Sequence, residues 1–323
     1  MLQSRNVSTI PLIIVNPKSA SGSTENRWAR IAADWAQFYG AFNVDFTQYR
    51  GHAVELAKKA AEEGREFIVA CGGDGTINEV ANGIMLSGKD AELGVLPMGT
   101  GGDFRRTLGM PSTIRRASEA LKNGITKRID VGKVTYVNHE DQTEERFFLN
   151  IASVGLSASI IERVKTTGNL SWLAFNSLRG KASFAYSTLA EIVNLNAKTI
   201  RVHFDNESVK ALQTIVFCVA NARYFGGGMK IAPDAVIDDG LFDVVNIGDI
   251  SKGKIMLNAQ KLYAGTHYSL DEVKHTTATR IEVSAFGTEE IHIETDGELP
   301  GKLPAVFEIL PSALRVRVPK PKN

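Results

Sequence analysis

The sequence predicts two domains. The first, over residues 1–130, is a nucleotide-binding α/β domain with a doubly wound, mostly parallel sheet; the second, over 131–323, is a mainly antiparallel β-sandwich. The whole chain has 323 residues, which is more than a single hydrophobic core usually supports. Apolar runs alternate with helical patterns in the first part, and longer β-branched runs with hairpin-like breaks fill the second. The extreme C-terminal segment is a candidate to pack back on the first domain.

The first domain is predicted from alternating apolar runs and amphipathic patterns. For example, Trp28, Ile31 and Trp35 fall on one helical face. The predicted elements, in order, are a strand at 11–15, a helix at 24–39, a strand at 43–48, a helix at 52–63, a strand at 67–71, a helix from Thr76 and a strand at 93–97.

The second domain is predicted from eight β-rich runs. They lie at 131–137, 146–153, 199–205, 213–221, 240–248, 280–286, 290–295 and 313–319. Two helical stretches, at 168–195 and 254–267, interrupt them, and the polar insert at 138–145 is predicted to be a solvated hairpin tip.

Composition excludes several classes of protein. A net charge of +1 without a basic stripe argues against nucleic acid as a partner. Cys71 and Cys218 lie in apolar runs and are expected to be reduced core residues, and the six histidines lack the spacing of zinc ligands. We see no signal peptide and no apolar run long enough to span a bilayer, and therefore expect a cytoplasmic protein.

The most informative stretch is FIVACGGDGTINEV, residues 67–80. Glycine tolerates positive φ and exposes its N–H, so the glycines around Asp74 suit a turn that wraps a polyphosphate. Thr76 and Glu79 have capping-box spacing, which predicts a helix that starts at Thr76 and points its free N–H groups at an anion. The alternative is a plain strand-to-helix turn with a solvated Asp74.

A second stretch of the same kind favours the functional interpretation. LGVLPMGTGGDFRR, residues 93–106, also runs from an apolar strand into a glycine-rich turn that carries one aspartate, Asp103. In an open parallel sheet both turns lie beyond the carboxyl edge, where ligands bind.

The ordered set of motifs resembles the diacylglycerol-kinase-like lipid kinases of bacteria (YegS/DgkB type), which are distantly related to NAD kinases. The similarity runs nearly end to end. It rests on NPKSA (16–20), GGDGTINE (72–79), GTGGDF (99–104), IDVGK (129–133), the tract 221–244, and TDGE (295–298) followed by FEILPSALRV. Two positions differ from the family pattern: Ala20 and Gly102 replace a glycine and an asparagine.

The resemblance implies an ATP- and Mg2+-dependent kinase that phosphorylates a lipid hydroxyl in an interdomain cleft. Asp74, Asp103 and Asp130 are implied to form a carboxylate and water network that holds the catalytic Mg2+, which would relieve the repulsion among them. The implied nucleotide-binding residues are Asn16, Pro17, Lys18, Ser19, Ala20, Thr47, Gly72, Gly73, Asp74, Gly75, Thr76, Ile77, Asn78, Glu79 and Thr100.

Two further acidic sites follow from the resemblance. Asp296 and Glu298 correspond to the acidic pair at the acceptor hydroxyl, one of them the proton acceptor. Spacing alone favours an acidic strand end, with His292, Glu294 and Asp296 on one wet face, and the surrounding family pattern reverses that preference. A structural Mg2+ is implied on the Asp239 side chain and the carbonyl groups of Val236 and Leu241; the alternative is a β-turn around Asp239.

The expected partner is a lipid substrate, reached by transient contact with the inner face of the membrane. Residues 170–193 and the mouth of the cleft are the candidate contact region, although a core-packed helix explains that composition too. Phosphorylation of a soluble dinucleotide and a non-catalytic lipid- or nucleotide-binding regulator remain alternatives. The sequence leaves open the lipid, the nucleoside triphosphate, the effect of Gly102, which of Asp296 and Glu298 accepts the proton, and the oligomeric state, with a homodimer among the options.

Overall fold

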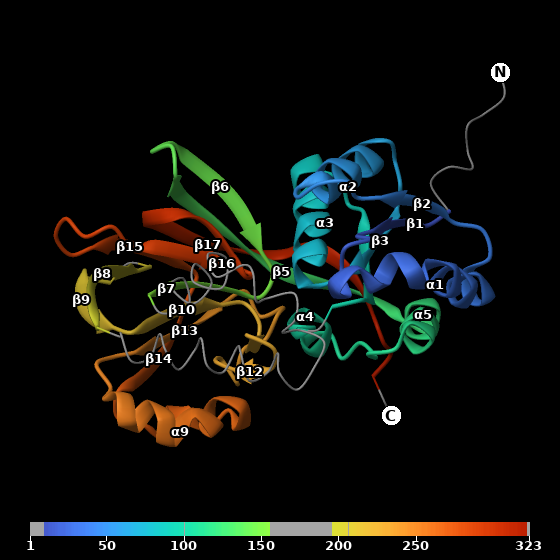
Figure 1. Ribbon diagram of the computed structural model, residues 1–323. Coiled ribbons are helices and arrows are strands. Elements are labelled where there is room, and N and C mark those ends of the chain that lie inside the picture. The colour runs from blue at the N-terminus through green and yellow to red at the C-terminus, as the bar shows by residue number, and fades with distance from the viewer. Residues whose placement is uncertain (1–9, 100, 156–195, 206, 322–323) are drawn as a thin grey trace. The chain divides into compact units, whose positions relative to one another are not determined.

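The computed structural model describes residues 10–99, 101–155, 196–205 and 207–321. The chain divides into two compact units, and each is described by itself (Figure 1). Unit 1 comprises Met1–Val131 together with Ser312–Asn323, and unit 2 comprises Gly132–Pro311. The predicted fold classes, a mostly parallel α/β domain and an antiparallel β-rich domain, are confirmed.

Unit 1 is built on a parallel sheet. Its strands lie in the order β2 (Asn43–Phe46), β1 (Leu12–Val15), β3 (Phe67–Gly72) and β4 (Glu92–Pro97), and every pairing among them is parallel. β1 is buried at all four positions, and β3 and β4 are buried at five of six. Such continuous burial arises when helices cover both faces of a sheet.

The helices of unit 1 cover the sheet in two pairs. In Figure 1, α2 and α3 lie on one side of these strands and α1 and α5 on the other. Trp35 is completely buried on α1, as its helical spacing predicted. The helices are η1 (Ala20–Gly22), α1 (Ser23–Tyr39), α2 (His52–Glu62), α3 (Asp74–Ser87), α4 (Asp103–Thr107) and α5 (Ile114–Asn123).

The end of the chain completes the sheet of unit 1. Strand β17 (Glu298–Val318) pairs in parallel with β4 through Arg315 and Val316. Arg317 then forms a bidentate ion pair with Glu92, with Nε–Oε1 and Nη2–Oε2 distances of 2.8 and 2.5 Å. Glu92 is only 3% exposed, so this ion pair fixes the last strand on the buried edge of β4.

Unit 2 is an antiparallel sandwich with long strands. β17 pairs with β16 through residues up to Lys302 and with β15 from Ala305 on. It therefore joins the strands on the β16 side of the sandwich to those on the β15 side. Phe148, Phe217 and Phe307 are buried in the core between them. The other strands are β5 (Ile125–Asn138), which begins in unit 1 and continues into unit 2 from Gly132, β6 (Thr143–Phe148), β7 (Ile151–Gly155), β8 (Lys198–Phe204), β9 (Lys210–Thr214), β10 (Val216–Ala220), β11 (Tyr224–Phe225), β12 (Met229–Lys230), β13 (Phe242–Ile247), β14 (Val273–Ala278), β15 (Arg280–Ala285) and β16 (His292–Thr295).

A second, smaller core of unit 2 lies under a helix. α9 (Lys252–Ala264) and η2 (His267–Ser269) pack on the far side of β10 and β13 through partly buried residues such as Ile255 and Leu262. The predicted hairpin tip is present between β5 and β6, where Glu140 and Asp141 are exposed. The predicted helical stretch 168–195 lies outside the described residues.

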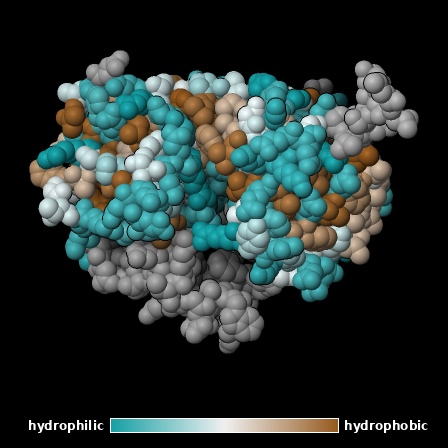
Figure 2. Space-filling model, turned by 90° about the horizontal axis from the view of Figure 1, so that it is seen from above, coloured by the Kyte–Doolittle hydropathy of each residue, from teal (hydrophilic) through white to brown (hydrophobic). Residues whose placement is uncertain are grey.

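The molecular surface is mixed in character. On the face seen in Figure 2, hydrophobic residues are interspersed with hydrophilic ones over both units. Among the helices that the model describes, none is both long and apolar enough to cross a membrane.

Candidate active site

Three loops of unit 1 meet at the carboxyl ends of its parallel strands. The loop after β1 is held to the loop after β3 by Asn16, whose N–H donates to the carbonyl of Cys71 at 3.0 Å and whose Nδ2 donates to Oγ1 of Thr76 at 3.1 Å. The loop after β4 joins them because the N–H of Met98 donates to the carbonyl of Gly72 at 2.8 Å. The structure therefore brings together three of the sequence-predicted tracts.

The glycines of these loops are required for close approach. A Cβ on Gly99 would lie 2.6 Å from Cα of Gly73, and a Cβ on Gly72 would lie 2.4 Å from Oγ1 of Thr76. The expectation that Gly72, Gly73 and Gly75 supply positive φ is wrong, since none of them has one. Gly72 and Gly99 are small because the Thr76 side chain and the Gly73 backbone touch them, whereas a Cβ on Gly75 would meet nothing within 4 Å.

Helix α3 begins at Asp74, two residues earlier than predicted, and the predicted capping box is not formed. Gly73 is the N-cap residue without a side-chain cap, and its carbonyl accepts the first helical bond from Ile77. Glu79 instead accepts a hydrogen bond from the N–H of Gly51 at 3.0 Å, which ties α3 to the start of α2. The first N–H groups of α3 have no acceptor within the helix and present a positive dipole end.

Asp74 and Asp103 are neighbours. The Asp74 carboxylate accepts the N–H groups of Asp103 and Phe104, both at 3.2 Å, and so caps the start of α4. Asp103 is buried and forms an ion pair with Arg106, with an Nη1–Oδ1 distance of 2.8 Å. The carboxylates of Asp74 and Asp103 thus lie beside the N-terminal end of α3, and that of Asp103 is paired with the Arg106 cation.

Position 102 differs chemically from the family motif. Gly102 has φ of 64°, and a Cβ there would lie 3.1 Å from Nε of Arg105. Arg105 is held by a bond from Nη1 to the carbonyl of Met110 at 2.8 Å. Burial and the neighbouring Arg106 lower the pKa of Arg105, against the raising effect of Asp74 and Asp103. The Arg105 guanidinium therefore occupies space next to a residue that has no side chain.

Asp130 is the third residue of the predicted carboxylate network and also belongs to unit 1. It is 1% exposed, and its Oδ1 accepts the N–H of Ser312 at 2.7 Å. Within the described ranges, no three acidic, histidine or cysteine side chains are grouped so as to ligate a metal directly. The water-mediated network of Asp74, Asp103 and Asp130 stays a prediction.

Most of the remaining residues predicted to bind the nucleotide lie in the loop after β1, and Thr47 directly follows β2. Lys18 is exposed, and its N–H donates to Oδ1 of Asn16 at 3.0 Å; Ser19 is buried and its hydroxyl lies 2.6 Å from that of Thr24. Thr47 is bonded through its N–H to the carbonyl of Val15 at 2.9 Å. Ala20 has φ of 49°, which explains why glycine suits that position. Thr100 lies outside the described residues.

In unit 2, Asp296 occupies a tight turn. Asp296 and Gly297 have φ of 47° and 88°, and they connect β16 to β17 as a two-residue hairpin in which Thr295 pairs with Glu298. The Asp296 carboxylate accepts three consecutive backbone N–H groups, those of Leu149, Asn150 and Ile151, at 2.7, 2.9 and 3.0 Å. Its side chain therefore fixes the corner between β6 and β7.

Glu298 and Glu294 differ in their surroundings. Glu298 forms an ion pair with Arg146 of β6, with an Nη2–Oε2 distance of 2.9 Å, and both side chains are partly exposed. Glu294 is 5% exposed and accepts hydrogen bonds at 2.5 Å from the hydroxyl of Ser153 and the N–H of Gly297. The alternative of a wet face shared by His292, Glu294 and Asp296 is therefore wrong, because Glu294 is buried and accepts the hydroxyl of Ser153 on the neighbouring strand β7.

Glu294 is a structural partner of this hairpin that the sequence did not indicate. The pairing of β16 with β7 that buries it joins residues about 140 positions apart, so no local signal marks it. The Asp-Gly pair between two strand runs was a usable signal for the turn itself.

The candidate structural metal site is a turn before β13. Oδ1 of Asp239 accepts the N–H of Leu241 at 3.1 Å, and Val236 is exposed beside it. Burial, together with the charges of Asp239 and Asp234, raises the pKa of the nearby Asp243 to about 6. Mutual repulsion among these carboxylates is what a bound cation would relieve, so the residues fit a cation.

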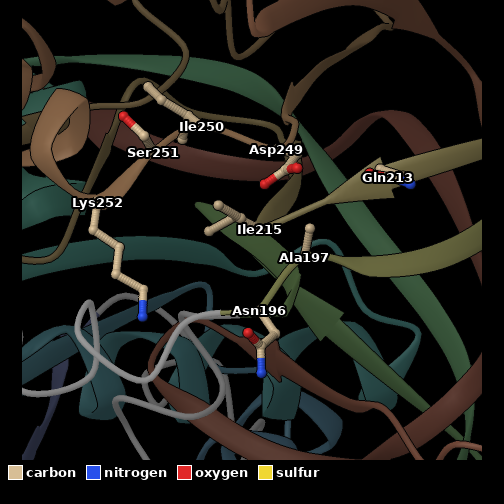
Figure 3. A pocket seen from close by; sticks show the side chains of 8 residues that line it. All are labelled: Asn196, Ala197, Gln213, Ile215, Asp249, Ile250, Ser251 and Lys252. Carbon is tan, nitrogen blue, oxygen red and sulfur yellow. The ribbon is translucent and has the colours of Figure 1, made fainter.

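A pocket of unit 2 contains none of the predicted site residues. It has a volume of about 360 Å³ and is lined by residues from three segments, as Figure 3 shows. They are Asn196, Ala197, Gln213, Ile215, Asp249, Ile250, Ser251 and Lys252.

Comparison with known proteins gives a consistent result. Residues 11–134 match the model of the diacylglycerol kinase catalytic domain, and residues 151–318 match that of the YegS C-terminal NAD kinase beta sandwich-like domain. Diacylglycerol kinase of Bacillus subtilis (strain 168) is 29% identical over 96% of this chain and 96% of its own length. Diacylglycerol kinase of Staphylococcus haemolyticus is 30% identical over 85% of this chain and 77% of its own length.

Solved structures share the fold. A crystal structure of a diacylglycerol kinase from Bacillus anthracis str. Sterne has a TM-score of 0.70 at 21% identity, covering 97% of both chains. Another structure from that organism has a TM-score of 0.76 at 24% identity, covering 97% of this chain and 98% of the other. With the motifs and the two domain matches, the chain belongs to the YegS/DgkB-type diacylglycerol kinase family of lipid kinases.

Proposed function

We propose that this protein transfers the γ-phosphoryl group of ATP, with Mg2+, to the hydroxyl of diacylglycerol or a related lipid. The observation that carries the proposal is the meeting of three loops of unit 1 around the free N-terminal end of α3, with Asp74 and Asp103 beside it. Backbone N–H groups at a helix start suit a phosphate, and adjacent carboxylates suit a magnesium ion.

Within unit 1, we assign the nucleotide to the loops after β1 and β3. Asn16 fixes the loop that carries the exposed Lys18, and the N–H groups at the start of α3 receive phosphate oxygens. Asp74 and Asp103 hold the magnesium ion, directly or through water. When bound, that ion supplies positive charge against the phosphates, which is the main requirement of phosphoryl transfer.

Within unit 2, we propose that Glu298 accepts the proton of the lipid hydroxyl and that Asp296 is a positioning residue. Asp296 accepts three backbone N–H groups of the folded chain, so its orientation is set by the corner that it holds. Glu298 forms an ion pair with Arg146 on the partly exposed side of β6, and that ion pair can rearrange when an alcohol approaches. The proposal requires both units to act on one pair of substrates.

We also propose a structural Mg2+ on Asp239 with the carbonyl groups of Val236 and Leu241. The two cysteines are free and buried, which suits the reducing cytoplasm, and we place the enzyme at the cytoplasmic face of the membrane.

The test is incubation with γ-labelled ATP, Mg2+ and defined lipids: diacylglycerol, phosphatidylglycerol and a sphingoid base, with NAD as a soluble acceptor. We expect a labelled lipid and no labelled dinucleotide. Asp296→Ala should lower turnover ~100-fold, the typical cost of a small misplacement of reacting groups, because it releases the 149–151 corner that its carboxylate holds. Labelled NADP would favour the dinucleotide kinase, and ATP binding without any product would favour a regulator.

Asp296→Asn and Glu298→Gln separate positioning from proton transfer. Asn keeps an acceptor oxygen, so we expect a lower melting temperature with part of the activity retained. Gln at 298 should leave the melting temperature nearly unchanged and remove turnover. The opposite pattern would exchange the roles of the two residues.

A further inference from the structure

Arg105 lies on the short helix α4, next to the site at the start of α3. The two helices are in contact (Figure 1), and the Asp74 carboxylate accepts the N–H groups of Asp103 and Phe104, both at 3.2 Å. Burial and Arg106 lower the pKa of Arg105, whereas Asp74 and Asp103 are close enough to raise it. The Arg105 guanidinium therefore stands beside the two carboxylates to which we assign the magnesium ion.

The guanidinium of Arg105 has one edge that is held and one edge that is open. Nη1 donates to the carbonyl of Met110 at 2.8 Å, which fixes the position of the group. In the part of the chain that the structure describes, no residue accepts a hydrogen bond from Nε or Nη2. These two nitrogens form one side of the arginine fork, and such a pair of donors binds two oxygens of a carboxylate or a phosphate.

Gly102 leaves open the space in front of that edge. A Cβ at position 102 would lie 3.1 Å from Nε, 3.7 Å from Nη2 and 3.8 Å from Cζ of Arg105. The two open donors thus face the place where the side chain of residue 102 would begin. The family pattern has an asparagine at this position, and its side chain would fill the same space. Gly102 and Arg105 are therefore complementary to each other.

The chemistry of the site favours a phosphate group in front of this edge. Asp103 already has a cation, because it is paired with Arg106 at 2.8 Å. Asp74 lies on the other side of the glycine turn, where a Cβ on Gly101 would lie 2.8 Å from its Oδ2. A triphosphate and two carboxylates together carry more negative charge than one magnesium ion neutralises. Arginine is a common source of the further positive charge in phosphoryl transfer.

We propose that Arg105 binds a phosphate oxygen of the nucleotide through Nε and Nη2, and that it takes the place of the asparagine side chain of the family pattern. The inference rests on the proposed function, because it requires a nucleotide at the start of α3. It goes beyond that function by assigning phosphate binding to a residue that the motifs do not indicate, and by giving Gly102 a reason.

The test is calorimetric titration of the full chain with three ligands: MgATP, tripolyphosphate with Mg2+, and adenosine. Arg105→Ala should weaken the binding of MgATP and of tripolyphosphate at least ~10-fold, the usual cost of losing hydrogen bonds to a charged group, and leave adenosine binding unchanged. Arg116→Ala is the matched control, because Arg116 is an exposed arginine on helix α5 of the same unit. It should bind all three ligands as the parent chain does.

A double variant tests the replacement of asparagine by arginine. Gly102→Asn/Arg105→Ala carries the residue of the family pattern at position 102. In the presence of Gly102→Asn, the further change Arg105→Ala should alter the affinity for MgATP by less than ~3-fold, because asparagine already fills the space. A loss of ~10-fold or more with either residue at position 102 would show that the two positions act independently, which contradicts the replacement.

Two other results would overturn the proposal. One is parental binding of tripolyphosphate by Arg105→Ala; the other is an equal loss for adenosine, since Arg105 would then support the loop and not the phosphate. If Arg105→Ala does not fold, Arg105→Lys decides in the same way, because lysine keeps the charge without the planar fork. Weaker tripolyphosphate binding by Arg105→Lys would support the proposal, and parental binding would contradict it.

The parent chain separates this inference from the proposed function. If the parent binds MgATP and Arg105→Ala binds it equally well, only the role of Arg105 fails. If the parent binds no MgATP, the nucleotide site of the proposed function fails, and the role of Arg105 fails with it.

Discussion

The two acidic turns of the molecule, around Asp74 and around Asp296, use the same chemistry in different settings. Each carboxylate accepts successive backbone N–H groups: two at the start of α4 for Asp74, and three at the 149–151 corner for Asp296. The partners of Asp74 are about 30 residues away in sequence, whereas those of Asp296 are about 146 residues away.

The difference in sequence separation follows from how each unit is assembled. Unit 1 brings its loops together because parallel strands end at one edge, so each loop is positioned by the strand before it. Unit 2 depends on antiparallel pairing between β7 and β16, segments remote in sequence. The exception in unit 1 is its last strand, which returns from the C-terminus to β4.

The largest expected effect on stability comes from the last strand, which returns from the C-terminus to β4. Glu92→Gln should lower the free energy of unfolding by about 3 kcal/mol, because it leaves the Arg317 guanidinium beside a buried neutral group. Urea denaturation measures this. Glu92→Leu/Arg317→Met removes both charges and should recover most of the loss. A double variant as unstable as the single one would show that packing of the strand, and not the ion pair, holds the C-terminus.

The next effect concerns the charges of unit 2. The folded-state pKa of Asp243, about 6, lies above its ordinary value of 3.8, so the folded state binds the extra proton between these values. Stability relative to Asp243→Asn should therefore fall as pH rises from about 4 to 6, by about 2–3 kcal/mol in total. Burial lowers the pKa of His267, but both proteins share that contribution.

Magnesium is expected to change this pH dependence. A cation on Asp239 would lower the pKa of Asp243 and flatten the pH dependence, whereas chelator should restore it. Thermal unfolding at several pH values, with Mg2+ and with EDTA, gives the comparison. Identical curves in both conditions would contradict the structural metal site.

The smallest effect is at position 102. Gly102→Asn should destabilise the protein by about 1 kcal/mol, because its Cβ would lie 3.1 Å from Nε of Arg105. Asparagine tolerates the left-handed backbone, so the Arg105 contact is the main cause. Gly102→Asn combined with Arg105→Ala should be less destabilised than the sum of the single variants. Additive effects would show that the two side chains do not compete for space.

Much of unit 1 could be predicted from sequence, because its signals are local. The apolar runs, the helical periodicity and the two glycine turns located the strands, the helices and the loops that meet. The start of α3 was wrong because Thr76 is bonded to Asn16 and Glu79 to Gly51, tertiary bonds that local capping rules do not include.

Less of unit 2 could be predicted. Alternation along 290–295 indicated a strand, but the covering of Glu294 by β7 depends on pairing across about 140 residues. The helical stretch at 254–267 was predicted, yet only the fold shows which side chains of α9 face outward.

In the function that we propose, the Asp74 turn binds the nucleotide and its magnesium ion, and Glu298 accepts the proton of the lipid alcohol. Its most direct test is calorimetric titration of ATP with Mg2+ into Asp74→Asn and Glu298→Gln, alongside turnover on diacylglycerol. We predict that Glu298→Gln binds the nucleotide like the parent chain while its turnover falls at least ~100-fold, and that Asp74→Asn loses nucleotide affinity as well. Parental turnover by Glu298→Gln, or parental nucleotide binding and turnover by Asp74→Asn, would contradict the account.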